Sequence, residues 1–203
     1  MAADCLQWLR PGDNMTTLAS KLLTEKRFWN VISRSLAGTD SVRLTAKKQE
    51  RLLEQELDRL SRDEHTGFLG HFYACYRKAY RKDLWAVAFV VMGGCSDDCF
   101  MDFRTWLVLR GKPVYTAALQ NPDSLCREFA KIPKADLPHW EYYLSKQYDR
   151  RFGEGAHDKA YRCFKFSPEE LADPENEWNG DDEASIKRLC PTVFDKYWGK
   201  LRF

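Results

Sequence analysis

The sequence has no long hydrophobic run. Its longest apolar stretch, Leu84 to Met92, covers nine residues, about half of the ~18 that a membrane-spanning helix needs. The N-terminus also lacks the basic segment followed by an apolar segment that is typical of a signal peptide. These absences favour a soluble protein of the cytoplasm and exclude a membrane role.

An excess of one charge is missing as well. The chain has 32 basic and 30 acidic residues, for a net charge of +2, whereas nucleic-acid binders usually carry a clearly basic surface. A nucleic-acid-associated module is therefore only a second alternative. It would depend on a cluster of basic residues between positions 77 and 82, namely Arg77, Lys78, Arg81 and Lys82.

The cysteines do not form a disulfide framework. There are seven of them, an odd number in a chain without a secretion signal, which favours reduced thiols. None of them is part of a CxxC pair. No cofactor is expected.

Hydrophobic periodicity predicts a mostly or wholly α-helical protein. The 203 residues favour one domain, a bundle of about 7–9 helices over residues 23–203, preceded by a loosely attached arm over residues 1–22. The helix near 84–92 is apolar on all sides, which predicts that it lies buried at the centre, although a strand over 87–92 is the competing interpretation. Residues at about 167–183 are predicted to form an acidic surface loop.

The richest motif lies between two apolar segments: Gly93-Gly94-Cys95-Ser96-Asp97-Asp98-Cys99. One interpretation is a polar active site of a hydrolase or transferase, built on Cys95, Asp97, Asp98 and Arg104. A helix start after Cys95 would lower the pKa of its thiol, whereas the two adjacent carboxylates would raise it.

Metal binding is a second interpretation of this motif. His71 and Cys75 are spaced i, i+4 on a predicted helix, and Cys95 and Cys99 would complete a set of four soft ligands. Hard-metal binding by Asp97, Asp98 and Asp102 is an alternative.

The structural interpretation needs no ligand. The glycines permit a tight turn, and Ser96 or Asp97 caps the next helix. Arg104 forms an internal ion pair with Asp97, Asp98 or another carboxylate, and Cys95 is a small buried side chain. A polar pocket for a small ligand or a partner remains open.

The motif also carries a resemblance. The string GGCSDDxFxxFRxWL over residues 93–107, followed by Asn121-Pro122-Asp123-Ser124-Leu125, resembles a largely bacterial family of domains of unknown function. Some members of that family are fused to WGR modules. The resemblance spans residues 24–198 and departs from the pattern at Cys99, where glycine is expected. It implies no particular reaction.

Without a convincing catalytic set, the sequence favours a non-enzymatic protein-binding domain, such as a regulator or an immunity-type inhibitor. Eight acidic residues with no intervening base form a candidate surface for a basic partner: Glu169, Glu170, Asp173, Glu175, Glu177, Asp181, Asp182 and Glu183. A second aromatic and basic cluster, Tyr73, Tyr76, Arg77, Tyr80 and Arg81, either lines a groove or forms one face of an amphipathic helix. The amphipathic interpretation is favoured.

Overall fold

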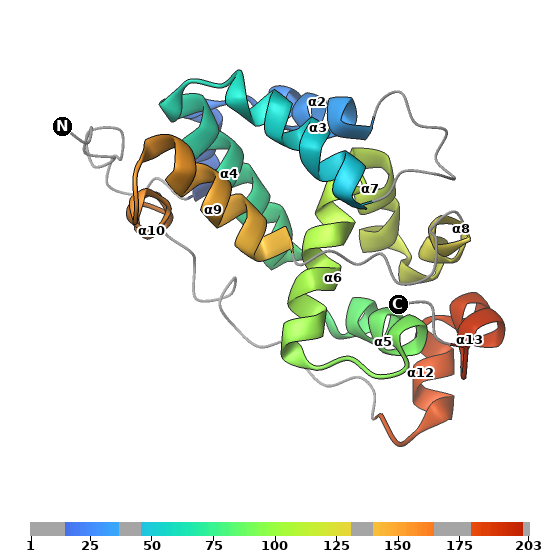
Figure 1. The fold of residues 1–203 in the computed structure, drawn as a ribbon. Coiled ribbons are helices and arrows are strands. Elements are labelled where there is room, and N and C mark those ends of the chain that lie inside the picture. Colours follow the sequence, from blue (N-terminus) through green and yellow to red (C-terminus); the bar gives the residue numbers. More distant parts are fainter. Residues whose placement is uncertain (1–14, 37–45, 131–139, 165–179, 201–203) are drawn as a thin grey trace.

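A computed structural model describes residues 15–36, 46–130, 140–164 and 180–200 (Figure 1). Within these ranges the chain forms twelve α-helices and one 3-10 helix, and no strand. The expected single helical domain is confirmed. It has more helices than the 7–9 expected, because several of them are only one or two turns long. The bounds of the first seven are α1 Met15–Leu22, α2 Glu25–Leu36, α3 Ala46–Asp58, α4 Arg62–Lys78, α5 Lys82–Met92, α6 Asp97–Leu109 and α7 Lys112–Gln120.

The remaining helices follow in the order η2 Pro122–Leu125, α8 Cys126–Phe129, α9 Trp140–Phe152, α10 Ala156–Arg162, α12 Glu183–Leu189 and α13 Pro191–Tyr197. Most of the predicted acidic loop, residues 167–179, lies outside the described part of the chain.

Helix α5 is the buried helix that the apolar run predicts, and the competing strand is not formed. Six of its eleven residues are buried, and it packs against α6, η2, α12 and α13. It ends at Gly93, whose φ of 70° lies in the left-handed region, a conformation that glycine adopts without steric cost. The chain then turns sharply into α6.

Helix α6 connects the two halves of the molecule. It runs through the middle of the fold in Figure 1, where it contacts α4 and α9 on one side and α5 and α7 on the other. The core around it is rich in aromatic rings. The fully buried large aromatics are Phe28, Phe68, Phe72, Phe100, Phe103, Phe129 and Tyr148, in agreement with the high aromatic content.

The folded part begins earlier than residue 23. Helix α1, inside the predicted arm, packs against α4 and buries Ala19 completely. Two glycines of α4 allow this close approach, because a Cβ atom at Gly67 or Gly70 would lie 2.7 Å from α1 or from Leu23, which follows it. Of the predicted arm, residues 15–22 therefore pack on α4, and residues 1–14 lie outside the described part of the chain.

No single helix in the described ranges is long and apolar enough to cross a membrane. By length and composition the pair α5 and α6 passes that test together, with a bend of 102° between the two helices.

Candidate functional site: a tyrosine-lined groove

The glycine-rich motif forms the junction between α5 and α6. Ser96 is the N-cap of α6, and its hydroxyl accepts a hydrogen bond from the Cys99 N–H at 3.4 Å. The side chain of Trp85 fixes the turn from the other side, since its Nε1–H donates to the Cys95 carbonyl at 2.9 Å. The predicted capping role is thus confirmed for Ser96.

Cys95 lacks the surroundings of a nucleophile. Burial, with smaller contributions from Cys99 and Asp97, raises the pKa of the Cys95 thiol to about 12. The thiol therefore stays protonated at neutral pH, and the protonated form is a weak nucleophile. Its Sγ–H is directed to the Ser96 carbonyl at 3.7 Å.

The predicted ion pair between Arg104 and the motif is not formed. The side chains of Asp97 and Asp98 are exposed and make no hydrogen bond or ion pair with any described residue. Arg104 is only 6% exposed and donates from Nη2 to the Tyr76 hydroxyl at 2.8 Å. Its guanidinium carbon lies 3.9 Å from the centre of the Tyr76 ring and 4.5 Å from that of Tyr80. Aromatic faces attract the delocalised cation there.

The soft-ligand set for a metal is not assembled either. No group of three or more potential ligands from His, Cys, Asp and Glu occurs among the described residues. His71 instead hydrogen-bonds through Nε2 to the Leu23 carbonyl at 2.7 Å, and burial raises the pKa of Cys75 to about 12. The spacing of His71 and Cys75 is right for a shared helix face, but Cys95 and Cys99 lie at the far end of α5.

Two of the four predicted active-site residues do meet in one place. Asp97 and Arg104 line a groove of about 560 Å³ between α4, α6 and α10, whereas Cys95 and Asp98 do not line it. We call it the tyrosine groove, because four tyrosines contribute to it. Its lining residues are Tyr73, Tyr76, Arg77, Tyr80, Asp97, Met101, Arg104, His157, Asp158 and Tyr161.

The phenolic hydroxyls of the groove are held by neighbouring polar groups. Tyr73 forms a hydrogen bond of 2.7 Å with Nε2 of His157, and Tyr161 accepts one from Arg77 at 3.2 Å. The backbone N–H of His157 donates to Asp149 at 2.7 Å, which places the start of α10. The rings therefore have defined positions before any ligand arrives.

The sequence reveals one side of this groove and misses the other. Residues 73, 76, 77 and 80 follow helical spacing, and the structure places them on a groove, not merely on the solvated face of an amphipathic helix. His157, Asp158 and Tyr161 of α10 were not predicted, since nothing in their local pattern relates them to α4. The only available signal was the aromatic and polar character of a short helix.

Three of the four basic residues between 77 and 82 contact different groups of the chain. Arg77 donates to Tyr161, and Arg81 pairs with Asp83 and donates to the Leu119 carbonyl. The Lys82 ammonium lies 4.4 Å above the Trp85 ring.

Of the eight acidic candidates, those from Glu169 to Glu177 lie outside the described residues. Asp181, Asp182 and Glu183 are exposed. Asp182 caps α12, because its carboxylate accepts hydrogen bonds from the N–H groups of Ala184 and Ser185.

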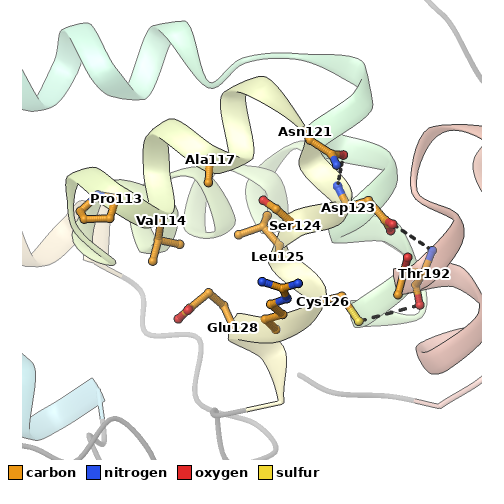
Figure 2. Close-up of a pocket in the computed structure, with 11 residues that line it drawn as sticks. Pro113, Val114, Ala117, Asn121, Asp123, Ser124, Leu125, Cys126, Glu128 and Thr192 are labelled. Carbon is orange, nitrogen blue, oxygen red and sulfur yellow. Dashed lines mark hydrogen bonds between the residues drawn. The ribbon is translucent and has the colours of Figure 1, made fainter.

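A second feature of the resemblance has a structural explanation (Figure 2). The Asn121 side chain accepts a hydrogen bond from the Asp123 N–H at 3.1 Å. The Asp123 carboxylate in turn accepts from the N–H groups of Thr192 at 3.1 Å and Val193 at 2.8 Å. These bonds satisfy the first turn of α13, and they form one wall of a cavity of about 630 Å³. The segment from Asn121 to Leu125 therefore anchors the C-terminal helices.

The family model described as "Protein of unknown function (DUF4240)" matches residues 23–150. The chain belongs to this family. The DUF4240 region contains α2 to α9 apart from the last two residues of α9, and with them the α4 and α6 walls of the tyrosine groove. Helix α10, which supplies the third wall, lies beyond the match. No curated protein and no solved structure matches the chain.

Proposed function

We propose that this chain is a protein-binding domain of the cytoplasm whose tyrosine groove takes up a basic segment of a partner protein. The observation that carries the proposal is the composition of the groove, in which four tyrosines and two arginines line one concave surface. Tyrosine and arginine are enriched among the residues that dominate the energy of protein interfaces.

The groove is also rigid enough to bind with a small entropic cost. Three of its tyrosine hydroxyls already have hydrogen-bond partners, and Arg104 is held against two rings. Side chains that are ordered before binding lose less conformational freedom when the partner arrives.

The charges at the rim select the partner. Arg104 is buried beneath the rings, whereas the carboxylates of Asp97 and Asp158 are exposed, the latter with 75% of its side chain accessible. The groove thus presents two accessible anions around an aromatic surface. The acidic run from Glu169 to Glu183 adds further negative charge to the chain, and such charge steers a basic partner towards it.

The signature string and the expected role as a regulator or inhibitor both fit this groove. The GGCSDDxFxxFRxWL string serves as the family signature because it builds the α5–α6 junction and places Asp97 and Arg104. A regulator or an immunity-type inhibitor in a bacterial cell would use such a groove to occupy the surface of its target.

The test compares two neighbouring aspartates. Asp97 lines the groove and Asp98 does not, yet both are exposed and both lie in the first turn of α6. The Asp97→Lys/Asp158→Lys variant and the Asp98→Lys control are used in affinity capture at low salt. The captured protein is then purified, and its affinity is measured by calorimetry.

We expect the wild type and Asp98→Lys to bind one stoichiometric partner. The double variant should bind it about tenfold more weakly, since each reversed rim charge is worth up to about 1 kcal/mol. Equal binding by all three proteins, or the absence of a stoichiometric partner, would contradict the proposal.

A further inference from the structure

A separate cavity of about 640 Å³ lies between α2, α4 and α7. It is lined by residues of these helices together with Ser20 of α1 and Tyr80, which lies between α4 and α5. It shares only Arg77 and Tyr80 with the tyrosine groove. Neither the signature motif nor the proposed partner binding uses it. Its lining combines aromatic rings, an imidazole and several cations. Each of these groups limits the chemical class of ligand that the cavity can bind.

His71 presents an available hydrogen-bond acceptor to this cavity. The side chain is only 4% exposed, and its Nε2 lies 2.7 Å from the Leu23 carbonyl. A carbonyl only accepts, so Nε2 carries the proton and Nδ1 is the acceptor. Burial also lowers the pKa of His71, which keeps the ring neutral at pH 7. No described residue donates to Nδ1, and a ligand with an O–H or N–H group would satisfy it.

Two of the aromatic residues, Trp29 and Tyr115, are buried in the wall of the cavity, and their polar atoms already have partners within the chain. Trp29 and Tyr115 pack with their ring centres 5.5 Å apart. The Trp29 Nε1–H already donates to Glu25 at 3.0 Å, and the Tyr115 hydroxyl donates to the Cys75 carbonyl at 2.9 Å. Ala74 and Leu119 extend this wall with partly exposed apolar side chains. A flat, apolar ligand body fits such a lining.

The charge of the cavity is positive. Its lining includes the cations Arg77, Lys78 and Lys112 against the single carboxylate of Glu25, which forms an ion pair with Lys112 at 2.9 Å. Lys78 is exposed at the end of α4 and pairs with no other described residue. It is therefore the ammonium group that is available to a ligand anion.

We propose that this cavity binds a small aromatic carboxylic acid that carries a hydroxyl or amino group. The ring lies along the wall formed by Ala74, Tyr115 and Leu119, the donor reaches Nδ1 of His71, and the carboxylate lies near Lys78. This inference does not depend on the proposed partner, because it concerns a different cavity and is tested on the chain alone.

Three related compounds separate the contributions of the ring, the hydrogen-bond donor and the carboxylate charge to the affinity. 4-Hydroxybenzoate has the ring, the donor and the charge, benzoate lacks the donor, and 4-hydroxybenzyl alcohol lacks the charge. Their affinities are measured by ligand-observed NMR titration up to about 10 mM, the range expected for ligands of this size. We expect 4-hydroxybenzoate to bind about two- to tenfold more tightly than benzoate and about two- to fivefold more tightly than the alcohol.

Three variants, with a fourth as a replacement, locate the site at which the acid binds. Ala74→Leu fills the cavity and should abolish binding, whereas Ala117→Leu, on the side of α7 that lines the cavity of Figure 2, should leave it unchanged. Lys78→Ala removes an exposed charge and should weaken the two acids about two- to fivefold while leaving the alcohol unaffected. Thr116→Trp, at an exposed lining position, replaces Ala74→Leu if that variant does not fold.

The inference would be overturned if none of the three compounds binds the wild type. It would also be overturned if the filled variants bind 4-hydroxybenzoate as well as the Ala117→Leu control does, because the acid would then occupy another surface.

Discussion

The contact between α1 and α4 predicts an unusual result for a Gly→Ala substitution. In the middle of an exposed helix, alanine is favoured over glycine by about 1 kcal/mol. At Gly67 a Cβ atom would lie 2.7 Å from both the backbone nitrogen and the Cβ of Leu23, and 2.9 Å from the Cβ of Leu22. A rotamer change cannot remove a collision with backbone, so α1 has to move away from α4.

The magnitude follows from what this movement exposes. Leu23 is only 3% exposed, and full exposure of a leucine costs about 1.5–3 kcal/mol. Ala19, which is completely buried, adds up to about 1 kcal/mol of apolar surface. After the helix-propensity gain is subtracted, Gly67→Ala should lower the free energy of unfolding by about 1–3 kcal/mol.

The assay is urea unfolding at 25 °C, combined with limited trypsin digestion. Release of α1 should speed cleavage after Lys21 under native conditions, since a local opening exposes the backbone to the protease. Gly70→Ala should destabilise the protein in the same way, because its Cβ would lie 2.7 Å from that of Ala19. The double variant Gly70→Ala/Ala19→Gly serves as the control, since removing the Ala19 methyl group should restore part of the stability that Gly70→Ala loses. A Gly67→Ala variant as stable as the wild type, with unchanged cleavage, would refute the packing of α1 on α4.

Three further predictions concern stability. Ser96→Ala should cost about 1 kcal/mol through loss of the α6 cap, whereas Asp98→Ala should cost only about 0.3 kcal/mol, because the helix dipole acts weakly on an exposed charge; equal costs in chemical denaturation would contradict this assignment. Burial lowers the pKa of His65 to about 3, so the unfolded chain binds a proton near pH 6.5 that the folded chain does not. The contribution of His65 to the free energy of unfolding is therefore complete above that pH and should fall by about 1.4 kcal/mol per pH unit as the pH falls towards 3. Unfolding measured at several pH values should show a smaller dependence of the unfolding free energy on pH for His65→Leu. Arg151 donates to the carbonyls of Leu57, Asp58 and Leu60 at the end of α3, and Arg151→Lys should lower the unfolding free energy by about 2 kcal/mol because an ammonium cannot match this fork; an unchanged thermal midpoint would argue against it.

Local sequence patterns predicted the helices best where the signal comes from a few neighbouring residues. The apolar run identified α5, the paired glycines identified its end, and Ser96 identified the start of α6. Each of these features depends on φ angles, on caps or on hydrophobic periodicity, which are properties of a few neighbouring residues. Helical spacing likewise grouped Tyr73, Tyr76 and Tyr80, which line one groove at the end of α4 and just beyond it.

Pairings between distant segments were predicted less well. Arg104 was expected to pair with Asp97, Asp98 or another carboxylate, and the first two pairs are not formed, because the packing of α4 on α6 places the guanidinium against the rings of Tyr76 and Tyr80. The arm was expected to be loose, yet its described part, Met15–Leu22, packs closely on α4 because Gly67 and Gly70 carry no side chain. Two missing Cβ atoms on another helix leave no local signal.

The sequence alone determined that the chain folds as one helical domain with α5 buried and a capped junction before α6. It also singled out Cys95, Asp97, Asp98 and Arg104 around that junction as candidate site residues. The packing of the helices was needed to show that Asp97 and Arg104 share a groove with α10 and that Cys95 and Asp98 lie outside it. The same holds for the second cavity, which His71 and Lys78 line. Helix formation depends on contacts within about four residues, whereas a groove exists only once helices far apart in the chain have packed against each other.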